Sequence, residues 1–158
     1  MTFDARTFRN ALGCFPTGVT VVTATGADGA PVGVTISSFT SVSLSPPMVL
    51  FCLDDKSNCL ARFQCGGTFA VNVLSDSQRD LSLRFSGQVR DKWAGLAYDL
   101  GETGAPLLPD CQANFECVIR AVHDGGDHRI IVGEVLRIGY AEEGKPLVYC
   151  RGRYADLS

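Results

Sequence analysis

Hydroxyl side chains recur at alternate positions along one stretch of this sequence, the segment 33–47. In an extended chain, residues of the same parity lie on one face of the backbone. The hydroxyl residues that share this parity are Thr35, Ser37, Ser41, Ser43 and Ser45. Such a row of short donors, with backbone amides between them, suits a ligand that has several hydroxyl groups, a polar ring edge and a phosphate. The alternative is an ordinary solvated strand face, where Ser and Thr are common.

A second segment, 54–58, places a cation next to a predicted helix start. It reads Asp-Asp-Lys-Ser-Asn, and Lys56 stands directly before Ser57, which can cap a short helix. The first amides of a helix have no partners within the helix, so together with a lysine they can bind a phosphate. Arg84, at the end of the next predicted helix, would add a second cation. The alternative is a plain helix cap beside a solvated lysine.

The segment 124–128, Asp-Gly-Gly-Asp-His, puts a histidine at the start of a predicted strand. Its two glycines permit a tight turn. At the rim of a barrel the side chain of His128 would point into a cleft, where an imidazole can bind a carboxamide or pyrophosphate oxygen. The alternative is a histidine on a surface turn without a ligand.

The seven cysteines predict neither disulfides nor a metal site. Their number is odd, none forms a C-x-x-C pair, and the spacings of Cys111 with Cys117 and of His123 with His128 are poor for zinc. In a reducing compartment they are expected to pack as small hydrophobic side chains. The sequence also has no Gly-rich dinucleotide motif, no phosphate-binding loop and no nucleophile elbow. If the chain binds a nucleotide, we therefore expect strands and loops to do it.

The composition predicts a single globular domain over residues 1–158. Apolar residues make up 46% and charged residues 20% of the chain, and the formal net charge is −3. This charge, with a pI near 5.3, argues against nucleic acid or an anionic membrane as a partner. The longest apolar run, 48–53, is too short to span a bilayer, and the first ten residues have no apolar signal region. We therefore expect a cytoplasmic protein.

Strand patterns outnumber helix patterns along the chain. Runs of β-branched and apolar residues between turn residues predict strands over 19–25, 32–38, 48–53, 69–74, 113–121, 129–140 and 147–150. Helical spacing and capping residues predict helices over 3–15, over 58–64, and from Ser75 or Ser77 to Phe85. Residues 87–110 are expected to be mostly irregular. Because the strands connect through short turns, we predict an antiparallel sheet closed into a barrel, with two or three helices outside it.

The order and spacing of these motifs resemble one family. The motifs are Phe8–Leu12, Pro16–Thr23, Gly33–Pro47, Phe69–Leu74, Arg84–Gly87, Gly126–His128, Pro146–Tyr149 and Arg151–Tyr154. Over nearly its whole length the chain is similar to the flavin reductase-like, FMN-binding split-barrel family, the small reductases of two-component flavin-dependent monooxygenases. The resemblance implies a mainly β fold, a six-stranded antiparallel split barrel with flanking helices, that works as a homodimer with flavin bound near the interface.

The resemblance further implies an enzyme that transfers a hydride from NADH or NADPH to FMN or FAD and supplies the reduced flavin to a separate monooxygenase. Since the flavin itself accepts the hydride, no protein nucleophile is required. Two other functions are compatible with the fold: a non-catalytic FMN-binding electron carrier, and an oxidase that acts on a pyridoxamine phosphate. An intact Gly126–His128 motif, which the family uses for the nicotinamide nucleotide, argues against both.

The resemblance also assigns site residues, segment by segment. It places Gly33, Val34, Thr35, Ile36, Ser37 and Ser38 under the isoalloxazine ring. It makes Phe51, Cys52, Leu53 and Asp54 the neighbouring wall, puts the phosphate at Lys56 and Ser57, and closes the pocket with Arg84 and Phe85. It turns Gly126, Asp127 and His128 toward the nicotinamide nucleotide, with His128 as the catalytic candidate and Tyr149 as a weaker candidate on the same side. It implies no metal ligand.

Overall fold

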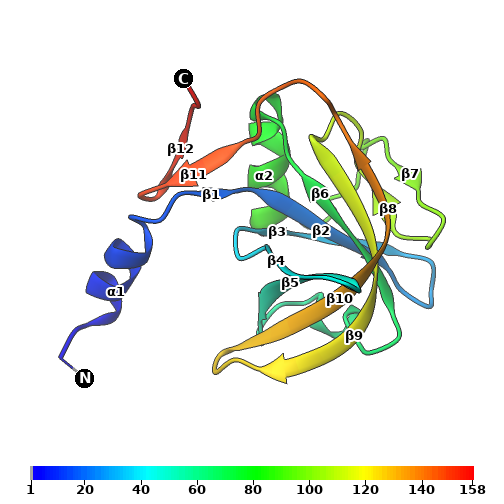
Figure 1. Cartoon of the computed structure of the whole chain (residues 1–158), viewed down its shortest axis with the longest axis horizontal. Coiled ribbons are helices and arrows are strands. Elements are labelled where there is room, and N and C mark those ends of the chain that lie inside the picture. Colours follow the sequence, from blue (N-terminus) through cyan, green and yellow to red (C-terminus); the bar gives the residue numbers. More distant parts are fainter. Residues whose placement is uncertain (1) are drawn as a thin grey trace.

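The fold is a curled antiparallel sheet with short helices around it (Figure 1). The structure, a computed structural model, describes residues 2–158. Its strands are β1 (Thr17–Gly18), β2 (Thr20–Thr25), β3 (Pro31–Ile36), β4 (Thr40–Leu44), β5 (Pro47–Asp54), β6 (Thr68–Val73), β7 (Asp99–Leu100), β8 (Pro106–Leu107), β9 (Ala113–Asp124), β10 (His128–Tyr140), β11 (Val148–Cys150) and β12 (Arg153–Ala155). Its helices are α1 (Ala5–Leu12) and α2 (Arg79–Ser86), with 3-10 turns η1 (Leu60–Arg62) and η2 (Asp76–Gln78).

The main sheet has the strand order β3-β2-β6-β9-β10-β5-β4, and all its pairs are antiparallel. The sheet curls until the end of β3 returns to β5, where the hydroxyl of Ser38 accepts the Cys52 amide at 2.9 Å and donates to the Cys52 carbonyl at 3.2 Å. Within residues 2–158 no strand ladder joins β3 to β5. The barrel is therefore split at this side, and the outer backbone edge of β3 stays open.

The predicted antiparallel split barrel is confirmed, with one difference in strand count. The main sheet has seven strands in the described chain instead of the predicted six. The seventh is β4, an edge strand that pairs with β5. Two smaller units flank the barrel: a sheet of β1, β11 and β12, and the hairpin β7–β8 inside the segment 87–110 that was expected to be irregular.

The barrel core is filled by aromatic side chains from β5, from β6 and from the residue that follows η1. Phe51, Phe63 and Phe69 are fully buried and pack edge to face, with ring centroids 5.3 to 6.4 Å apart. Burying one such side chain contributes about 1.5–3 kcal/mol to folding. A second cluster lies beneath α2 and includes the fully buried Phe85. This second cluster fixes α2 against the open side of the barrel.

A buried asparagine ties the barrel to the irregular segment beside it. The Asn72 amide donates to the Val21 carbonyl at 2.9 Å and to the Thr23 hydroxyl at 3.1 Å. Its carbonyl oxygen accepts the Leu108 amide at 2.9 Å and the Asn114 amide at 2.7 Å. Because every polar atom of Asn72 is paired, the side chain can be fully buried without a desolvation penalty.

Helix α1 lies beside the barrel, and none of its residues is buried (Figure 1). It is shorter than the predicted 3–15, and Asp4 caps it by accepting the Thr7 amide at 2.7 Å. The predicted apolar face is present, but it lacks a partner within residues 2–158. The side chains predicted for this face, Phe8 and Leu12 on α1 and Phe15 beyond its end, are 51, 57 and 75% exposed.

The expected row of five hydroxyl groups is wrong, because the chain does not stay extended. Strand β3 ends at Ile36, and β4 begins at Thr40 at the other end of the strand order. A register shift between Ser41 and Ser43 breaks the alternation again. Only the first two hydroxyl residues of the row, Thr35 and Ser37, therefore lie together.

All seven cysteines lie in the described chain and are free thiols, as predicted. Burial raises the pKa of Cys111 to about 11 and that of Cys117 to about 12. The expectation that all of them pack inside is wrong for Cys14 and Cys65, which are exposed. Neither α1 nor α2, the α-helices of residues 2–158, has the length and hydrophobicity that a bilayer-spanning helix needs.

Candidate functional site

A groove follows the open edge of β3. Three cavities, of about 360, 310 and 670 Å3, share Thr35 in their linings. The first lies between β3, α2 and the C-terminal strands, and the second between β3, the end of β5 and His128. The third extends over residues 56–59 and 85–92. Because they share lining residues, the cavities form one continuous groove with room for a nucleotide-sized ligand.

The floor of this groove is the outer edge of β3. In the sheet β3 pairs only with β2, so the N–H and C=O groups of its other edge face the groove. The Thr35 hydroxyl donates to the Ser82 carbonyl at 2.7 Å, which fixes α2 on β3 and occupies that donor. Ser37 is exposed and lines the first and second cavities. The polar groups offered to a ligand here are therefore the backbone of β3 and the Ser37 side chain.

One end of the groove is lined by cationic side chains, one of them Lys56 of the segment 54–58, which we call the phosphate loop after the role predicted for it. The Asp54 carboxylate accepts the Lys56 amide at 2.7 Å, and the Asp54 carbonyl accepts the Ser57 amide at 2.9 Å. This tight turn places Lys56 and Ser57 in the lining of the third cavity. Arg90 and Lys92, from the segment after α2, line the same cavity.

The predicted helix over 58–64 is wrong, and so is the helix-terminus phosphate site that was inferred from it. Only the three-residue turn η1 forms there, from Leu60 to Arg62. A single 3-10 turn has too few aligned peptide groups to act as a helix dipole. The positive charge of this end therefore comes from side chains alone.

The second functional segment is 124–128, which we call the His128 turn. Gly126 has a φ of +87°, a conformation that glycine adopts without strain, and the Gly125 amide donates to the His128 carbonyl at 2.9 Å. His128 pairs with Asp54 in the register of β10 and β5. This register brings the imidazole into the second cavity, whose lining also includes Ser57.

Asp127 orients the imidazole of His128. Its carboxylate lies 2.7 Å from His128 Nδ1. The hydrogen bond from His128, and next the charge of His128, lower the pKa of Asp127 below its usual value, and Lys56 acts in the same direction. Asp127 therefore stays ionised at neutral pH and favours a proton on Nδ1. This leaves Nε2 as the ring nitrogen that a ligand can use.

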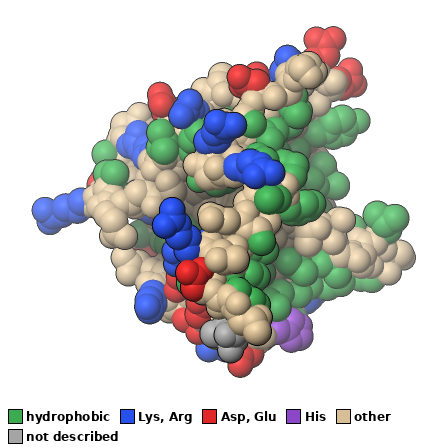
Figure 2. All heavy atoms as spheres, turned by 90° about the vertical axis from the view of Figure 1, so that its left-hand side faces the viewer, with side chains coloured by type: hydrophobic (Ala, Val, Ile, Leu, Met, Phe, Trp, Pro, Cys, Tyr) green, Lys and Arg blue, Asp and Glu red, His purple; other side chains and the backbone are tan. Residues whose placement is uncertain are grey.

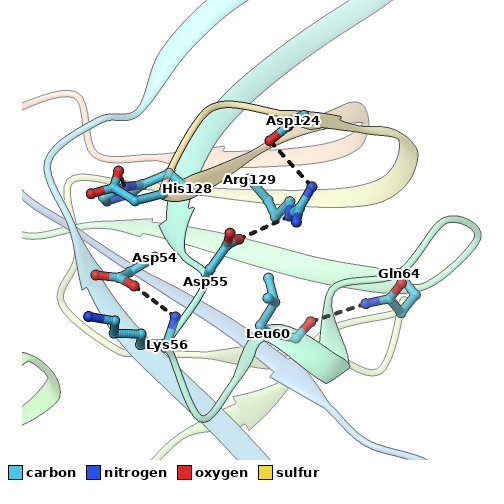
Figure 3. A network of polar contacts seen from close by, with 9 residues as sticks. Asp54, Asp55, Lys56, Leu60, Gln64, Asp124, His128 and Arg129 are labelled. Carbon is cyan, nitrogen blue, oxygen red and sulfur yellow. Dashed lines mark hydrogen bonds and ion pairs between the residues drawn. The ribbon is translucent and has the colours of Figure 1, made fainter.

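The two segments are also joined to each other, as Figure 3 shows. The Asp55 amide of the phosphate loop donates to the Asp127 carbonyl at 3.0 Å. The guanidinium of Arg129 lies between the carboxylates of Asp55 and Asp124. The cationic end of the groove and the histidine thus belong to one connected unit.

A comparison with known families decides the family assignment. A family model described as flavin reductase like domain matches residues 12–158. The chain belongs to this family.

Named members of the flavin reductase-like family are similar over almost the whole chain. The FMN reductase (NADH) SmoA of Agrobacterium fabrum is 46% identical over 155 residues, which cover 98% of this chain and 87% of SmoA. HsaB, the reductase subunit of a flavin-dependent monooxygenase of Mycobacterium tuberculosis, is 41% identical over 156 residues, which cover 98% of this chain and 83% of HsaB. The chain spans about half (49%) of a longer relative, a probable flavin reductase of Rhizobium meliloti, with 45% identity over 153 residues.

A solved structure supports the same assignment. The NADH:FAD oxidoreductase SgcE6 of Streptomyces globisporus, in complex with NAD and FAD fragments, matches with a TM-score of 0.93 and 38% identity. The match covers 98% of this chain and 93% of SgcE6. The family that the sequence predicted is confirmed, and with it the split-barrel fold and flavin reduction as the reaction class.

The second cavity brings most of the predicted flavin residues together. Its lining consists of Val34, Thr35, Ile36, Ser37, Ser38, Cys52, Leu53, Asp54, Ser57 and His128. These residues come from three segments that are far apart in the sequence. The curl of the sheet makes them neighbours, because it returns β3 to the end of β5.

Three predicted residues have other places in this structure. Gly33 and Phe51 are buried and line none of the three cavities of the groove; Gly33 packs against Phe85, and Phe51 belongs to the barrel core. Arg84 donates from Nε to the Lys92 carbonyl at 2.6 Å and from a terminal nitrogen to the Ala94 carbonyl. Its guanidinium therefore holds the segment after α2 in place, and only Phe85 of the predicted pair reaches the third cavity.

The first cavity contains residues that the sequence reasoning missed. Its lining includes Arg79, Arg153 and Tyr154 beside the predicted Tyr149. The Arg79 guanidinium lies 4.6 Å from the Tyr154 ring centroid, and the Tyr154 hydroxyl lies 2.7 Å from the Ser82 hydroxyl. The Arg151–Tyr154 motif was the available signal, but only the tertiary structure shows that it turns back onto α2.

Figure 2 shows the face that carries α1 and the C-terminal strands. Several Lys and Arg side chains stand on this face, although the whole chain has a net charge of −3. Cations also line both outer cavities of the groove: Arg79 and Arg153 in the first, and Lys56, Arg90 and Lys92 in the third. The groove is thus locally positive, as a site for an anionic nucleotide requires.

Proposed function

We propose that this protein is an NADH-dependent flavin reductase that releases reduced flavin to a separate flavin-dependent monooxygenase. The observation that carries the proposal is the single groove over β3. Its second and third cavities join the predicted flavin residues, Lys56 of the phosphate loop and His128. A flavin bound there supplies the hydride acceptor, so the chain needs to hold and align two nucleotides and does not need a nucleophile.

The donor set of the groove fits a flavin. The open backbone edge of β3 and the Ser37 hydroxyl offer the alternating donors and acceptors that the polar edge of an isoalloxazine ring requires. Lys56 and Ser57 would bind the phosphate. The Asp127-bound imidazole of His128 would bind the nicotinamide nucleotide, and backbone amides would stabilise negative charge that develops on the ring.

We propose that both FMN and FAD are accepted. The third cavity continues past Lys56 along residues 86–92, where Arg90 and Lys92 supply further positive charge. This is room for a second phosphate and a nucleoside. The names of SmoA, an FMN reductase (NADH), and SgcE6, an NADH:FAD oxidoreductase, support NADH as the donor and either flavin as acceptor.

The proposed assembly is a homodimer. It is supported by the exposed apolar side chains on and after α1, and by a second exposed row on the last part of β10, formed by Leu136, Ile138 and Tyr140. Sedimentation velocity on the full chain tests this: a dimer is expected, and a monomer at micromolar concentration would reject it. The monooxygenase partner is supported by the printed name of HsaB as a reductase subunit.

The decisive experiment measures NADH oxidation by the purified protein, with FMN, FAD or no flavin added. Turnover that depends on added flavin is expected and means that flavin is a substrate that enters and leaves. Turnover by a yellow protein without added flavin would mean that flavin is a tightly bound cofactor. FMN binding without turnover by NADH or NADPH would reject the proposal in favour of an electron carrier.

A further inference from the structure

Arg129, the residue after His128, contacts both functional segments. Its Nε donates to Asp55 of the phosphate loop at 2.9 Å, and its Nη1 lies 3.5 Å from a carboxylate oxygen of Asp124 in the His128 turn. Figure 3 shows the guanidinium between the two carboxylates, with the phosphate loop on one side and the β9–β10 hairpin on the other. A planar guanidinium can bond two acceptors in different directions, whereas a lysine ammonium is a single point of charge.

The strand register fixes this position. Arg129 stands opposite Asp124 in the β9–β10 pair and opposite Leu53 in the β10–β5 pair. The backbone also links the two segments, through the hydrogen bond from the Asp55 amide to the Asp127 carbonyl and the register pair of His128 with Asp54. Arg129 therefore supplies the side-chain part of the connection.

Charge gives Arg129 a second role. Four carboxylates gather in the two segments: Asp54, Asp55, Asp124 and Asp127. Without Arg129, Asp55 and Asp124 would face each other uncompensated, and like charges repel. Loss of the guanidinium would therefore push the phosphate loop and the His128 turn apart, in addition to removing a hydrogen bond.

We propose that Arg129 is a positioning residue that couples flavin binding at the phosphate loop to nicotinamide-nucleotide binding at the His128 turn. The roles of the two segments rest on the proposed function. Since a coupling free energy is reciprocal, the nicotinamide nucleotide must tighten flavin binding by the same factor by which flavin tightens nucleotide binding.

The same hairpin offers a matched control. Arg120 on β9 forms an ion pair with Glu134 on β10, with 2.7 Å between Nε and the carboxylate. Neither residue lines any of the three cavities of the groove. Arg120→Gln therefore removes a cross-strand ion pair of the same hairpin without touching the link between the two segments.

The binding test compares wild type, Arg129→Gln, Arg129→Lys and Arg120→Gln, all checked for equal folding by circular dichroism. Flavin fluorescence gives the Kd of FMN with and without saturating NAD+. Saturating NAD+ is expected to raise the affinity of wild type for FMN about threefold, and this coupling factor falls to about one in Arg129→Gln. Arg129→Lys retains part of it, and Arg120→Gln retains all of it. A coupling factor in Arg129→Gln equal to that of wild type, or an equal loss in Arg120→Gln, would overturn the proposal.

Two further readouts separate positioning from general damage and from failure of the proposed function. In NADH oxidation at saturating flavin, Arg129→Gln should raise the KM for NADH about threefold, by loss of the same coupling factor, while kcat changes less than about twofold. Amide hydrogen exchange needs no substrate: residues 54–58 and 124–128 should exchange faster in Arg129→Gln but not in Arg120→Gln. If wild type does not oxidise NADH, the proposed function fails, and hydrogen exchange still tests whether Arg129 holds the two segments together. Unchanged exchange in Arg129→Gln would refute that positioning role.

Discussion

Gly33 is the position where the structure makes the sharpest stability prediction. A Cβ at this residue would lie 2.6 Å from Cε1 and 2.8 Å from Cδ1 of Phe85, and 3.1 Å from Cζ2 of Trp93. Ordinary carbon–carbon contacts are about 3.5–4.0 Å, so the overlap with Phe85 is about 1 Å. Phe85 is fully buried and packs edge to face on Trp93, with centroids 5.0 Å apart. Neither ring can therefore withdraw without moving α2 or the segment after it.

The expected cost of Gly33→Ala follows from this overlap. Overpacking of a filled core costs about 1–3 kcal/mol. For a domain of this size each kcal/mol lowers Tm by about 2–4 °C, so the overlap by itself is expected to lower Tm by about 2–12 °C. Replacing glycine by alanine in a strand also brings a gain of about 0.5–1 kcal/mol from lost backbone freedom in the unfolded chain. A control variant must cancel that gain.

Gly139→Ala is this control, because Gly139 lies in β10 and a Cβ there meets no atom within 4 Å. Thermal unfolding by differential scanning calorimetry should give Gly139→Ala a Tm at or above that of wild type, and Gly33→Ala a lower one. Combining Gly33→Ala with Phe85→Leu should cost less than the sum of the single changes, because the two sites share one contact. Equal Tm values for the two alanine variants would refute the packing argument.

Three other outcomes are expected. In fluorescence titrations, Lys56→Ala should weaken the binding of FMN about three- to tenfold and leave the binding of riboflavin unchanged, because only FMN carries the phosphate. Equal weakening of the binding of both flavins would reject the phosphate role. His128→Ala should raise the KM for NADH more than it raises the Kd for FMN. Asp127→Asn should have a smaller effect in the same direction, because it removes only the hydrogen-bond partner of His128 Nδ1. A His128→Ala enzyme with normal KM and kcat would contradict this role. Burial raises the pKa of Cys111 to about 11 and that of Cys117 to about 12, whereas a thiol in the unfolded chain has a pKa near 9. The contribution of these thiols to the stability of the fold is therefore complete below the unfolded pKa and is lost as pH rises through the folded values. The urea concentration at the unfolding midpoint should therefore fall between pH about 8 and pH about 10 by more in wild type than in Cys117→Ala. Equal falls in the two proteins would contradict the burial argument.

Much of the fold could be predicted from the sequence because it depends on local pattern. Period-two alternation and β-branched runs indicated β2, β3, β5, β6, β9 and β10 to within a few residues. Turn residues such as Gly125 and Gly126 marked the hairpin that carries His128. The helix over 58–64 was predicted wrongly, because a local capping signal does not offset the cost of nucleating so short a helix, and only the turn η1 forms.

The sequence by itself determined which residue types are available for the site and, through the family resemblance, which chemistry they serve. Only the tertiary structure decided which of these residues face the groove. The curl of the sheet brought Ser37 and Ser57 to His128, turned Gly33 and Phe51 inward, and assigned the Arg84 guanidinium to two carbonyls. Arg129 lies on an ordinary strand position in the sequence, and its role depends on a register that aligns it with Asp124 across β9 and brings Asp55 beside it. Contacts between distant segments depend on how the strands close, and one-dimensional spacing does not encode that closure.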